Sequence, residues 1–410
     1  MPMDERRTEQ PRAPKVKTGL DVLEAEGFRR LHGRRLGVAT NHSAVNAKAQ
    51  RLLDLLAKHP ELWVNALFGP EHGIHGEAAA GHEVADSGQG SIPIYSLYGQ
   101  RRKPTAEMGK DFDVMLYDIQ DVGARFYTYI WTLFYVEQFC AEAGKKLIVL
   151  DRPNPIGGQI LEGPVLDEKF ASFVGLKPIP IRHGLTVGEL AILFNQQSWL
   201  GEGLRADLEV VPMEGWKREM WHDETGLPWI SPSPNILSLD TATVYPGTCL
   251  LEGTEWSEGR GTARPFEQVG GPAVDSRRLA EELNALDLQG CRFSPIHFTP
   301  ERIPGVAPRP KHEGKRCGGV RIQVDDRRAF QPVRTGLAII MALRSQEPGH
   351  GRWRPGGFDR LVGTDVVRKQ IEAGVELEAI VASWEDRLRR FDQTRKEAML
   401  YAKASYSRRF

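Results

Sequence analysis

Residues 35–42 read RLGVATNH, a short apolar run that ends in an amide and an imidazole side chain. Similar apolar runs follow at residues 62–68, 114–119 and 146–150, separated by segments of helical character at residues 47–58 and 124–143. Apolar runs that alternate with helices are typical of parallel strands buried on both faces. The first part of the chain is therefore predicted to be a Rossmann-like domain.

The pattern changes beyond residue 161, where Pro and Gly punctuate long loops. Thr186 and Glu189 have the spacing of a capping box at the start of a helix over residues 186–195. Further helices are expected at residues 276–286, 335–344 and 377–391, and a strand at residues 319–324. The predicted fold is α/β: a mostly parallel sheet domain over residues 15–161 and a smaller α+β domain over residues 162–410.

Composition excludes several classes of function. Lys+Arg and Asp+Glu both number 54, so the net charge is +0 and gives no basic footprint for nucleic acid or an anionic membrane. No segment approaches the roughly 20 apolar residues of a membrane helix. The first 17 residues are polar, without a signal peptide. We expect a cytoplasmic chain, or a secreted or periplasmic one if a leader has been removed.

No cofactor is expected. The first strand is not followed by a Gly-x-Gly-x-x-Gly turn, and no Walker loop is present, so dinucleotide chemistry is not indicated. The four cysteines are scattered along the chain at Cys140, Cys249, Cys291 and Cys317. This spacing fits neither a zinc site nor a dense disulfide framework, and buried free thiols are the simpler interpretation.

Polar side chains follow the end of each of the four predicted strands. In chain order they are Asn41, then Glu71 and His72, then Asp118 and Asp121, then Asp151 and Arg152. Ligands of an open parallel sheet bind outside the carboxyl ends of its strands. Four polar strand ends in succession therefore favour an active cleft at this edge.

Glu71 is the strongest single candidate for a catalytic role. It follows Pro70 and precedes glycines, so a sharp turn can project its carboxyl group into the crevice. A carboxyl group shielded from water there can serve as a general acid. The alternative is a glutamate that only stabilises the turn.

The same loop offers an alternative metal site. His72, His75 and Glu77 are close in sequence, with His82 and Glu83 beyond them. The loop lacks the His-Glu-x-x-His register, and its glycines oppose the helix that would aim two imidazoles together. Our main prediction therefore contains no metal, and a metal-dependent hydrolase or amidase is the second reading.

The third strand end leads into an aromatic helix. Asp118 and Asp121 are each candidates for the second carboxylate of a hydrolase or for a helix cap. Most of the aromatic residues must be core, but Tyr127 and Tyr129 lie in the first turns, where they can reach a cleft, and Arg125 is similarly placed.

A second polar concentration lies at residues 248–262. Its acids, glycines and arginine, Glu258 and Arg260 among them, suit a ligand with many hydroxyl groups. A plain charged surface loop is the alternative.

Several motifs occur together in a fixed order. They are FGPEHG (68–73), YDIQDVGARFYTY (117–129), LDRPNPIGG (150–158), EGP (162–164), PIRHG (180–184), SPN (233–235) and YPGT (245–248). In this respect the chain resembles the exo-β-N-acetylmuramidases, a family of peptidoglycan hexosaminidases long labelled a domain of unknown function. The resemblance covers the chain from about residue 18 to its end.

The resemblance implies a glycosidase that releases N-acetylmuramic acid from the non-reducing ends of peptidoglycan fragments. It also implies that the active site lies in the cleft between the two domains. Its general acid/base is expected to be Glu71, and the motifs place His183 and Asn235 among the substrate contacts. The expected partner is a muropeptide or a muramic acid–glucosamine saccharide. One position departs from the family, which usually shows an asparagine where this chain has Glu255-Trp256. Substrate preference is expected to differ if that position touches the sugar.

Glycoside hydrolysis needs an acid and a group that stabilises an oxocarbenium-like centre. With Glu71 as the acid, the candidate partners are Asp118, Asp121 and Glu162. Alternatively, the 2-acetamido group of the substrate attacks the anomeric carbon, and the second carboxylate orients that group.

The lactyl carboxylate of the substrate calls for a cation. Arg152, Arg182 and Arg260 are candidates, with Arg125 behind them, although each can instead form a surface ion pair. A third reading of the whole chain is a non-catalytic binder of muropeptides. The oligomeric state is not indicated.

Overall fold

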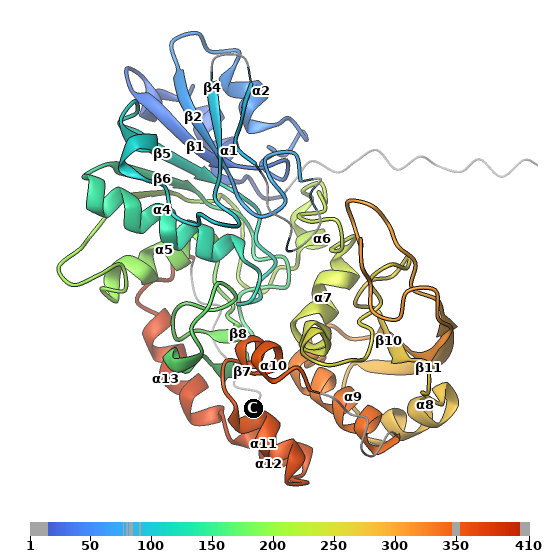
Figure 1. Cartoon of the computed structure of the whole chain (residues 1–410). Coiled ribbons are helices and arrows are strands. Elements are labelled where there is room, and N and C mark those ends of the chain that lie inside the picture. The colour runs from blue at the N-terminus through green and yellow to red at the C-terminus, as the bar shows by residue number, and fades with distance from the viewer. Residues whose placement is uncertain are drawn as a thin grey trace, which may run out of the picture.

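The computed structural model describes residues 15–76, 78, 81, 85–89, 92–346 and 353–401. A seven-stranded sheet forms the first part, in the order β3-β4-β2-β1-β5-β6-β9 (Figure 1). All its neighbouring strands are parallel except β3 against β4. The strands are β1 (Arg35–Thr40), β2 (Trp63–Gly69), β3 (Ser87–Gln89), β4 (Ile92–Ser96), β5 (Val114–Asp118), β6 (Lys146–Leu150) and β9 (Asp207–Val211).

Both faces of this sheet are covered. Alternate residues of the central strands pack into two separate apolar clusters, one shared with α4 and α5 and the other with α1 and α2. Strands buried on two faces are near-continuously apolar, as the sequence showed. The helices of this part are α1 (Gly19–Ala25), α2 (Leu52–Leu56), α3 (Ala106–Gly109), α4 (Tyr129–Ala143), α5 (Val187–Gln196) and α6 (His222–Thr225).

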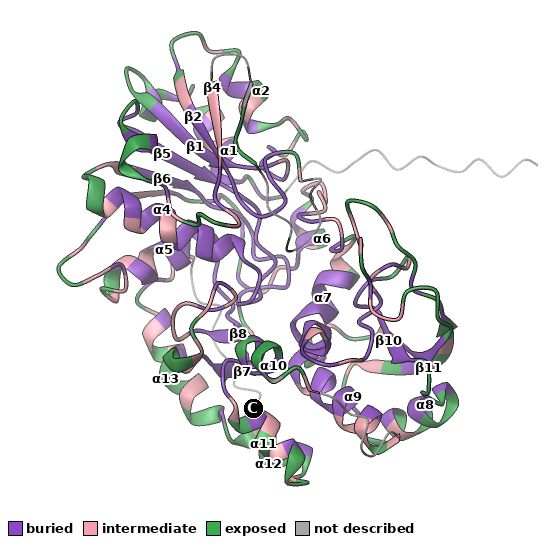
Figure 2. Cartoon of the chain, viewed as in Figure 1, coloured by how far each residue is buried: buried purple, intermediate pink, exposed green. Residues whose placement is uncertain are grey.

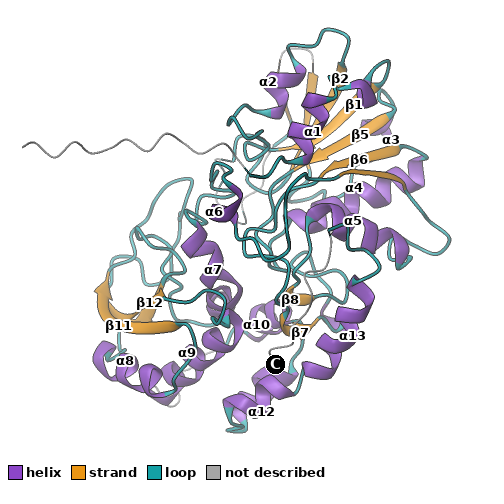
Figure 3. Cartoon of the chain, turned by 180° about the vertical axis from the view of Figure 1, so that it is seen from behind, coloured by secondary structure: helices purple, strands orange, loops and turns teal. Residues whose placement is uncertain are grey.

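The remainder of the chain forms a smaller α+β part beside the carboxyl ends of the strands (Figure 3). It contains a three-stranded antiparallel sheet in the order β10-β12-β11 and a two-stranded pair, β7 with β8. The strands are β7 (Glu162–Val165), β8 (Pro180–Arg182), β10 (Gln268–Gly271), β11 (Cys291–Phe298) and β12 (Cys317–Val324). The helices are α7 (Leu239–Thr248), α8 (Ser276–Ala285), α9 (Pro332–Gln346), α10 (Pro355–Val362), α11 (Val366–Glu372), α12 (Leu377–Ala382) and α13 (Glu385–Arg395).

The structure confirms the predicted mostly parallel sheet, with all four predicted strands adjacent in it. It also confirms the capping box of α5, where the Thr186 side chain and the Glu189 carboxylate each bond the other's backbone N–H. The predicted boundary at residues 161 and 162 stays a prediction, although β9 shows that the sheet takes in chain beyond it. No helix within the described ranges is long and apolar enough to cross a membrane.

Three predicted helices are shorter or broken in the structure. The helix expected at residues 124–143 is α4, which begins only at Tyr129 because Ala124 pairs with Arg182 in a β-bridge. The helix expected at residues 47–58 is only α2, because the Asn46 side chain accepts hydrogen bonds from the N–H groups of Lys48 and Gln50 and fixes a turn. The helix expected at residues 377–391 is broken into α12 and α13. Ser383 ends α12, and its hydroxyl returns to the Ile380 carbonyl in competition with the helical backbone.

Candidate active site

Glu71 lies in a tight turn directly after β2. His72 and Gly73 both have positive φ, 71° and 73°, and the Gly73 N–H donates to the Pro70 carbonyl at 2.9 Å. Glycine adopts this conformation freely, whereas a histidine adopts it only where its surroundings enforce it. The turn reverses the chain at once and leaves the Glu71 side chain at the carboxyl edge of the sheet, among loops that are largely buried (Figure 2).

The Glu71 carboxyl group accepts hydrogen bonds on both oxygens. The Thr128 hydroxyl donates to Oε2 at 2.6 Å, and the Gly81 N–H donates to Oε1 at 2.9 Å. The Tyr98 hydroxyl also hydrogen-bonds to this group. Glu71 is 8% exposed, and in the described part of the chain no Lys or Arg side chain forms an ion pair with it. Neutral donors alone therefore hold this buried carboxyl group.

Aromatic side chains surround it. The rings of Tyr127 and Tyr129 meet edge to face with centroids 4.7 Å apart, and His72 meets Tyr129 in the same manner at 6.4 Å. The Tyr129 hydroxyl donates to the Pro232 carbonyl at 2.8 Å. Burial raises the pKa of Tyr98, and the charge of Glu71 raises it further. These phenols therefore stay protonated and act as hydrogen-bond donors.

Asp121 lies close to this group. Its Oδ2 accepts the Gly123 N–H at 2.7 Å and lies 3.3 Å from Nε2 of His183, while Oδ1 is buried without a partner among the described residues. The pKa of Tyr127 is raised by burial and also by the charges of Asp121 and Glu71, so both carboxylates are within electrostatic range of one phenol. Asp121 and Glu71 thus belong to one cluster.

The smaller part of the molecule contributes charged groups to the same cluster. Nη2 of Arg260 lies 2.8 Å from Glu252 Oε1, and its Nε lies 3.6 Å from Glu258 Oε1. Lys311 pairs with the other Glu258 oxygen at 2.9 Å. Burial lowers the pKa of His72, and the Arg260 charge lowers it too, which places Arg260 near the Glu71 turn.

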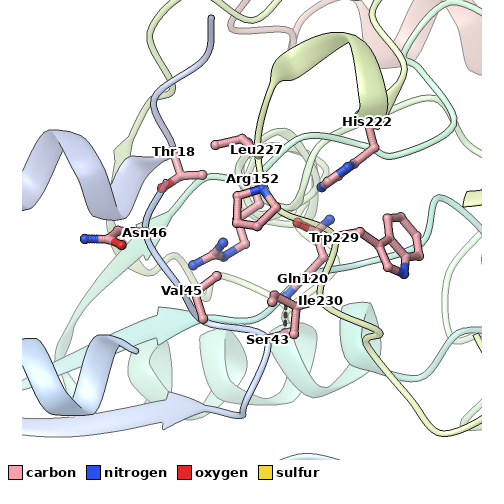
Figure 4. Close-up of a pocket in the computed structure, with 11 residues that line it drawn as sticks. Thr18, Ser43, Val45, Asn46, Gln120, Arg152, His222, Leu227, Trp229 and Ile230 are labelled. Carbon is pink, nitrogen blue, oxygen red and sulfur yellow. Dashed lines mark hydrogen bonds between the residues drawn. The ribbon is translucent and has the colours of Figure 1, made fainter. Parts of the chain in front are cut away.

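A second buried carboxylate at this edge has a different environment. Asp118, at the end of β5, receives two hydrogen bonds from Arg152, from Nε at 2.5 Å and from Nη2 at 2.9 Å. Both side chains are nearly inaccessible, at 0% and 4% exposure. Arg152 also lines a small pocket of about 20 Å³ (Figure 4). Asp118, one of the candidate second carboxylates, is therefore already paired with an arginine.

Two other predicted site residues have structural partners. Burial raises the pKa of Asp151 to about 7, and its oxygens accept the Thr186 hydroxyl and the Gly188 N–H, both at 2.8 Å, where α5 begins. Burial likewise raises the pKa of Glu162 to about 7, and Oε1 accepts the Arg334 N–H at 2.8 Å in the first turn of α9. Both acids therefore stabilise helix starts, and nothing in their contacts links them to Glu71.

Two of the predicted arginines donate hydrogen bonds to carbonyl groups of the main chain. Arg125 is fully buried and donates to the carbonyl groups of Pro164, Ile179 and Leu361. Arg182, 1% exposed, donates to the Ile156 carbonyl at 2.5 Å and lies over a tryptophan ring. Their guanidinium groups link loops of the fold, and a contact with the substrate stays a prediction for both.

The two predicted amides are also used within the fold. Asn41 Oδ1 accepts the N–H and the hydroxyl of Ser43, at 3.0 and 2.6 Å, and shapes the turn after β1. Asn235 donates to the Val306 carbonyl at 2.9 Å. Each amide thus keeps a loop in place at the edge of the cluster.

The structure describes two of the candidate metal ligands in this loop, His72 and His75. Nδ1 of His72 is hydrogen-bonded to the Ala78 carbonyl. Among the residues that the structure describes, no three His, Cys, Asp or Glu side chains gather as ligands would. Glu77, His82 and Glu83 lie outside the described residues.

Comparison with known proteins assigns the chain to a family. Residues 36–240 match the model for the N-terminal domain of the exo-beta-N-acetylmuramidase NamZ, and residues 243–401 match the model for its C-terminal domain. The chain belongs to the exo-β-N-acetylmuramidase NamZ family. This membership confirms the predicted family and the predicted class of enzyme, a glycosidase.

Relatives of known sequence and structure agree with this membership. The peptidoglycan beta-N-acetylmuramidase NamZ of Bacillus subtilis (strain 168) is 45% identical over 391 residues, which cover 95% of this chain and 92% of that protein. Two DUF1343 family proteins of Bacteroides fragilis NCTC 9343 have known crystal structures. One superposes with a TM-score of 0.87 at 34% identity, covering 96% of this chain and 100% of the other. The second has a TM-score of 0.78 at 35% identity, with 95% and 99% covered.

Two residues of the NamZ-family cluster escaped the sequence reasoning. Thr128 belongs to the motif at residues 117–129. It occupies the N-cap position of α4, where a threonine is expected to cap the helix. Instead it makes no capping hydrogen bond and donates to Glu71. Tyr98 lies just beyond β4, a strand that was not predicted, so no sequence signal placed it near Glu71.

Proposed function

We propose that this chain releases N-acetylmuramic acid from the non-reducing ends of peptidoglycan fragments, with Glu71 as the proton donor to the leaving oxygen. The observation that carries the proposal is a buried carboxyl group held on both oxygens by neutral donors. A general acid must carry a proton near neutral pH, and a cation paired with it would oppose this. No such pair is present at Glu71 within the described ranges.

The contact with Thr128 suits a group that gains and loses a proton. A threonine hydroxyl can donate to a carboxylate and can accept from a carboxylic acid. Thr128 can therefore hold Oε2 of Glu71 before and after proton transfer. The Gly81 N–H can only donate, and it fixes the other oxygen.

Of the three candidate partners, the contacts favour Asp121. Asp118 is neutralised by Arg152, and Glu162 accepts backbone N–H groups at the start of α9. Asp121 keeps one oxygen without a partner among the described residues and shares the neighbourhood of Tyr127 with Glu71. We propose that it stabilises the oxocarbenium-like centre or orients the substrate acetamido group.

The proposed substrate is a muropeptide or a muramic acid–glucosamine disaccharide. Its lactyl carboxylate needs a cation, and Arg260 is the most open of the four predicted arginines, with 19% of its side chain exposed. Its charge lowers the pKa of His72, which supports a role for Arg260 near a sugar bound at Glu71. The peptidoglycan beta-N-acetylmuramidase of Bacillus subtilis, 45% identical to this chain, supports this substrate class.

The test is replacement of the proposed acid. Glu71→Gln should lower kcat on a muramic acid–glucosamine disaccharide by about 10²–10⁴-fold, the usual contribution of a general acid. Glu61→Gln is the matched control, because Glu61 is an exposed acid that pairs with His59 just before β2, at the opposite edge of the sheet. Near-normal turnover by Glu71→Gln would refute the assignment.

A further inference from the structure

His183 lies against Asp121, the acid proposed above to assist the reacting sugar. Nε2 of His183 is 3.3 Å from Asp121 Oδ2, and the two residues are 0% and 3% exposed. Within the described residues, Asp121 has no Lys or Arg at ion-pair distance. The N–H of His183 is not aligned on the oxygen as a hydrogen bond. Contacts of this kind are often poorly aligned before substrate binds and tighten in the complex.

A backbone contact determines which ring nitrogen of His183 carries the proton. The Leu185 N–H donates to Nδ1 at 3.2 Å. A ring nitrogen that accepts a hydrogen bond carries no proton, so the proton of the neutral ring is on the other nitrogen. Nε2 is therefore the protonated nitrogen, and it is the one that faces Asp121.

The backbone holds His183 in this position. β8 is buried throughout (Figure 2), and Ala124, in the loop that follows β5, forms a β-bridge with Arg182 at the end of β8. His183 follows directly, opposite the loop that contains Asp121. Gly184 then turns the chain with a φ of 59°, a conformation that glycine adopts freely. This turn brings the Leu185 N–H back to the ring of His183.

The same arrangement leaves one oxygen of Asp121 for another group. Oδ2 accepts the Gly123 N–H at 2.7 Å and faces His183. Gly123 has a φ of 84°, and a Cβ there would lie 2.4 Å from the Asn154 side chain, so this turn requires glycine. Oδ1 is buried and has no partner in the part of the chain that the structure describes. Buried polar atoms are normally satisfied, so this oxygen is available to a group from outside the chain.

We infer that His183 is a positioning residue for Asp121 and does not itself contact the substrate. Together with the Gly123 N–H, it holds Oδ2 and so fixes the plane of the carboxylate, which presents Oδ1 to the reacting sugar. Asp121 and Glu71 both act electrostatically on Tyr127, which supports this direction for Oδ1. The inference rests on the proposed function, because it assigns His183 a role through Asp121.

The tautomer of His183 can be measured in the unmodified protein. In protein labelled with isotopic nitrogen in its histidines, long-range proton–nitrogen NMR spectra distinguish the two ring nitrogens. His183→Gln identifies the signals that belong to this residue. We expect Nε2 to carry the proton at neutral pH. A proton on Nδ1 alone would overturn the inference, whatever the role of Glu71.

Removal of the donor is the kinetic test. His183→Leu lacks the N–H, whereas His183→Gln keeps an N–H near the position of Nε2. For both variants, kcat/KM is measured on the muramic acid–glucosamine disaccharide and on 4-nitrophenyl N-acetylmuramide. We expect His183→Leu to lower kcat/KM by roughly 10- to 150-fold, the worth of a hydrogen bond to a charged group. His183→Gln should retain most of the activity.

The loss in His183→Leu should be similar on the two substrates, because Asp121 does not protonate the leaving oxygen. A loss confined to the disaccharide would place His183 with the proton donor and overturn the inference. Unchanged activity on both substrates would overturn it as well.

A double-mutant cycle tests whether His183 acts through Asp121. Asp121→Asn/His183→Leu should lose no more kcat/KM than Asp121→Asn alone, because the donor then has no carboxylate to position. Losses that multiply would show independent roles and overturn the inference. Urea unfolding establishes that each variant is folded. If His183→Leu does not fold, the tautomer and the activity of His183→Gln decide.

His59→Leu is the control. His59 also lies 3.0 Å from an acid, Glu61, but this pair is partly exposed and precedes β2, at the opposite edge of the sheet. Its kcat/KM should equal that of wild type.

Glu71→Gln separates this inference from the catalytic proposal. Normal turnover of Glu71→Gln with coupled losses at His183 and Asp121 would refute the proton donor and keep the positioning role. Loss of turnover in Glu71→Gln with multiplying losses in the cycle would refute the positioning role and keep the proton donor.

Discussion

Two buried carboxyl groups lie at the same edge of the same sheet, Glu71 after β2 and Asp118 at the end of β5, and their surroundings differ in kind. Asp118 faces a guanidinium group that donates two hydrogen bonds. Within the described residues, Glu71 accepts hydrogen bonds from hydroxyl and N–H donors. Burial raises the pKa of Asp118 and the Arg152 charge opposes that rise, whereas among the described residues no Lys or Arg side chain pairs with Glu71.

The comparison shows that position alone does not make an acid catalytic. Both groups follow strands at the edge where ligands bind, and both are buried. What separates them is the partner that the fold provides. Asp118 is expected to matter for stability, and Glu71 for turnover.

Asp118→Asn should lower the free energy of unfolding by about 3–5 kcal/mol, because it leaves the buried Arg152 charge uncompensated. Urea unfolding measures this change. The control is Asp113→Asn, which removes an exposed pair with Arg35 just before the same strand and should cost less than about 1 kcal/mol. Equal effects of the two variants would show that the buried pair contributes no more than a surface pair.

Glu162, a third buried carboxyl group, is expected to make the stability of the protein depend on pH. Burial raises the pKa of Glu162 to about 7 in the folded chain, against an ordinary value near 4.5. Between these values the folded state binds one more proton than the unfolded state, so this group makes stability fall as pH rises. The free energy of unfolding of Glu162→Gln, measured relative to that of wild type by urea unfolding, should therefore increase by about 3 kcal/mol between pH 4 and pH 7. A difference that is constant with pH would contradict the shift.

Thr128→Val should lower kcat/KM by roughly 10- to 100-fold, because it removes a hydrogen bond to a group that is charged in part of the cycle. Thr128→Ser keeps the hydroxyl and should retain most activity. Thr132→Val is the control one turn along α4, since the Thr132 hydroxyl bonds only the Thr128 carbonyl. Equal activity of Thr128→Val and Thr132→Val would remove Thr128 from the catalytic cluster.

Much of the fold follows from local patterns in the sequence. The apolar runs of β1, β2, β5 and β6 are buried on two faces. Such runs can be recognised in the sequence without knowing which strands pair. β9 was not predicted, because its DLEVV sequence lacks the continuous apolar run that marks the other strands. Its place beside β6 is set by tertiary pairing.

The candidate site was only partly predictable, for a physical reason. Glu71, Asp121 and the tyrosines follow strand ends, so the edge rule finds them. The direction of a long side chain does not follow from that rule. Arg125 turns inward to three carbonyl groups, whereas Arg260, from the other part of the chain, lies near the Glu71 turn.

The proton donor role of Glu71 is tested most directly by the dependence of its loss on the leaving group. Glu71→Gln and wild type are compared on the muramic acid–glucosamine disaccharide and on a 4-nitrophenyl N-acetylmuramide, whose phenolate departs without a proton. The account predicts that the variant loses about 10²–10⁴-fold on the disaccharide and at least tenfold less on the nitrophenyl glycoside. An equal loss on both substrates would contradict proton donation by Glu71.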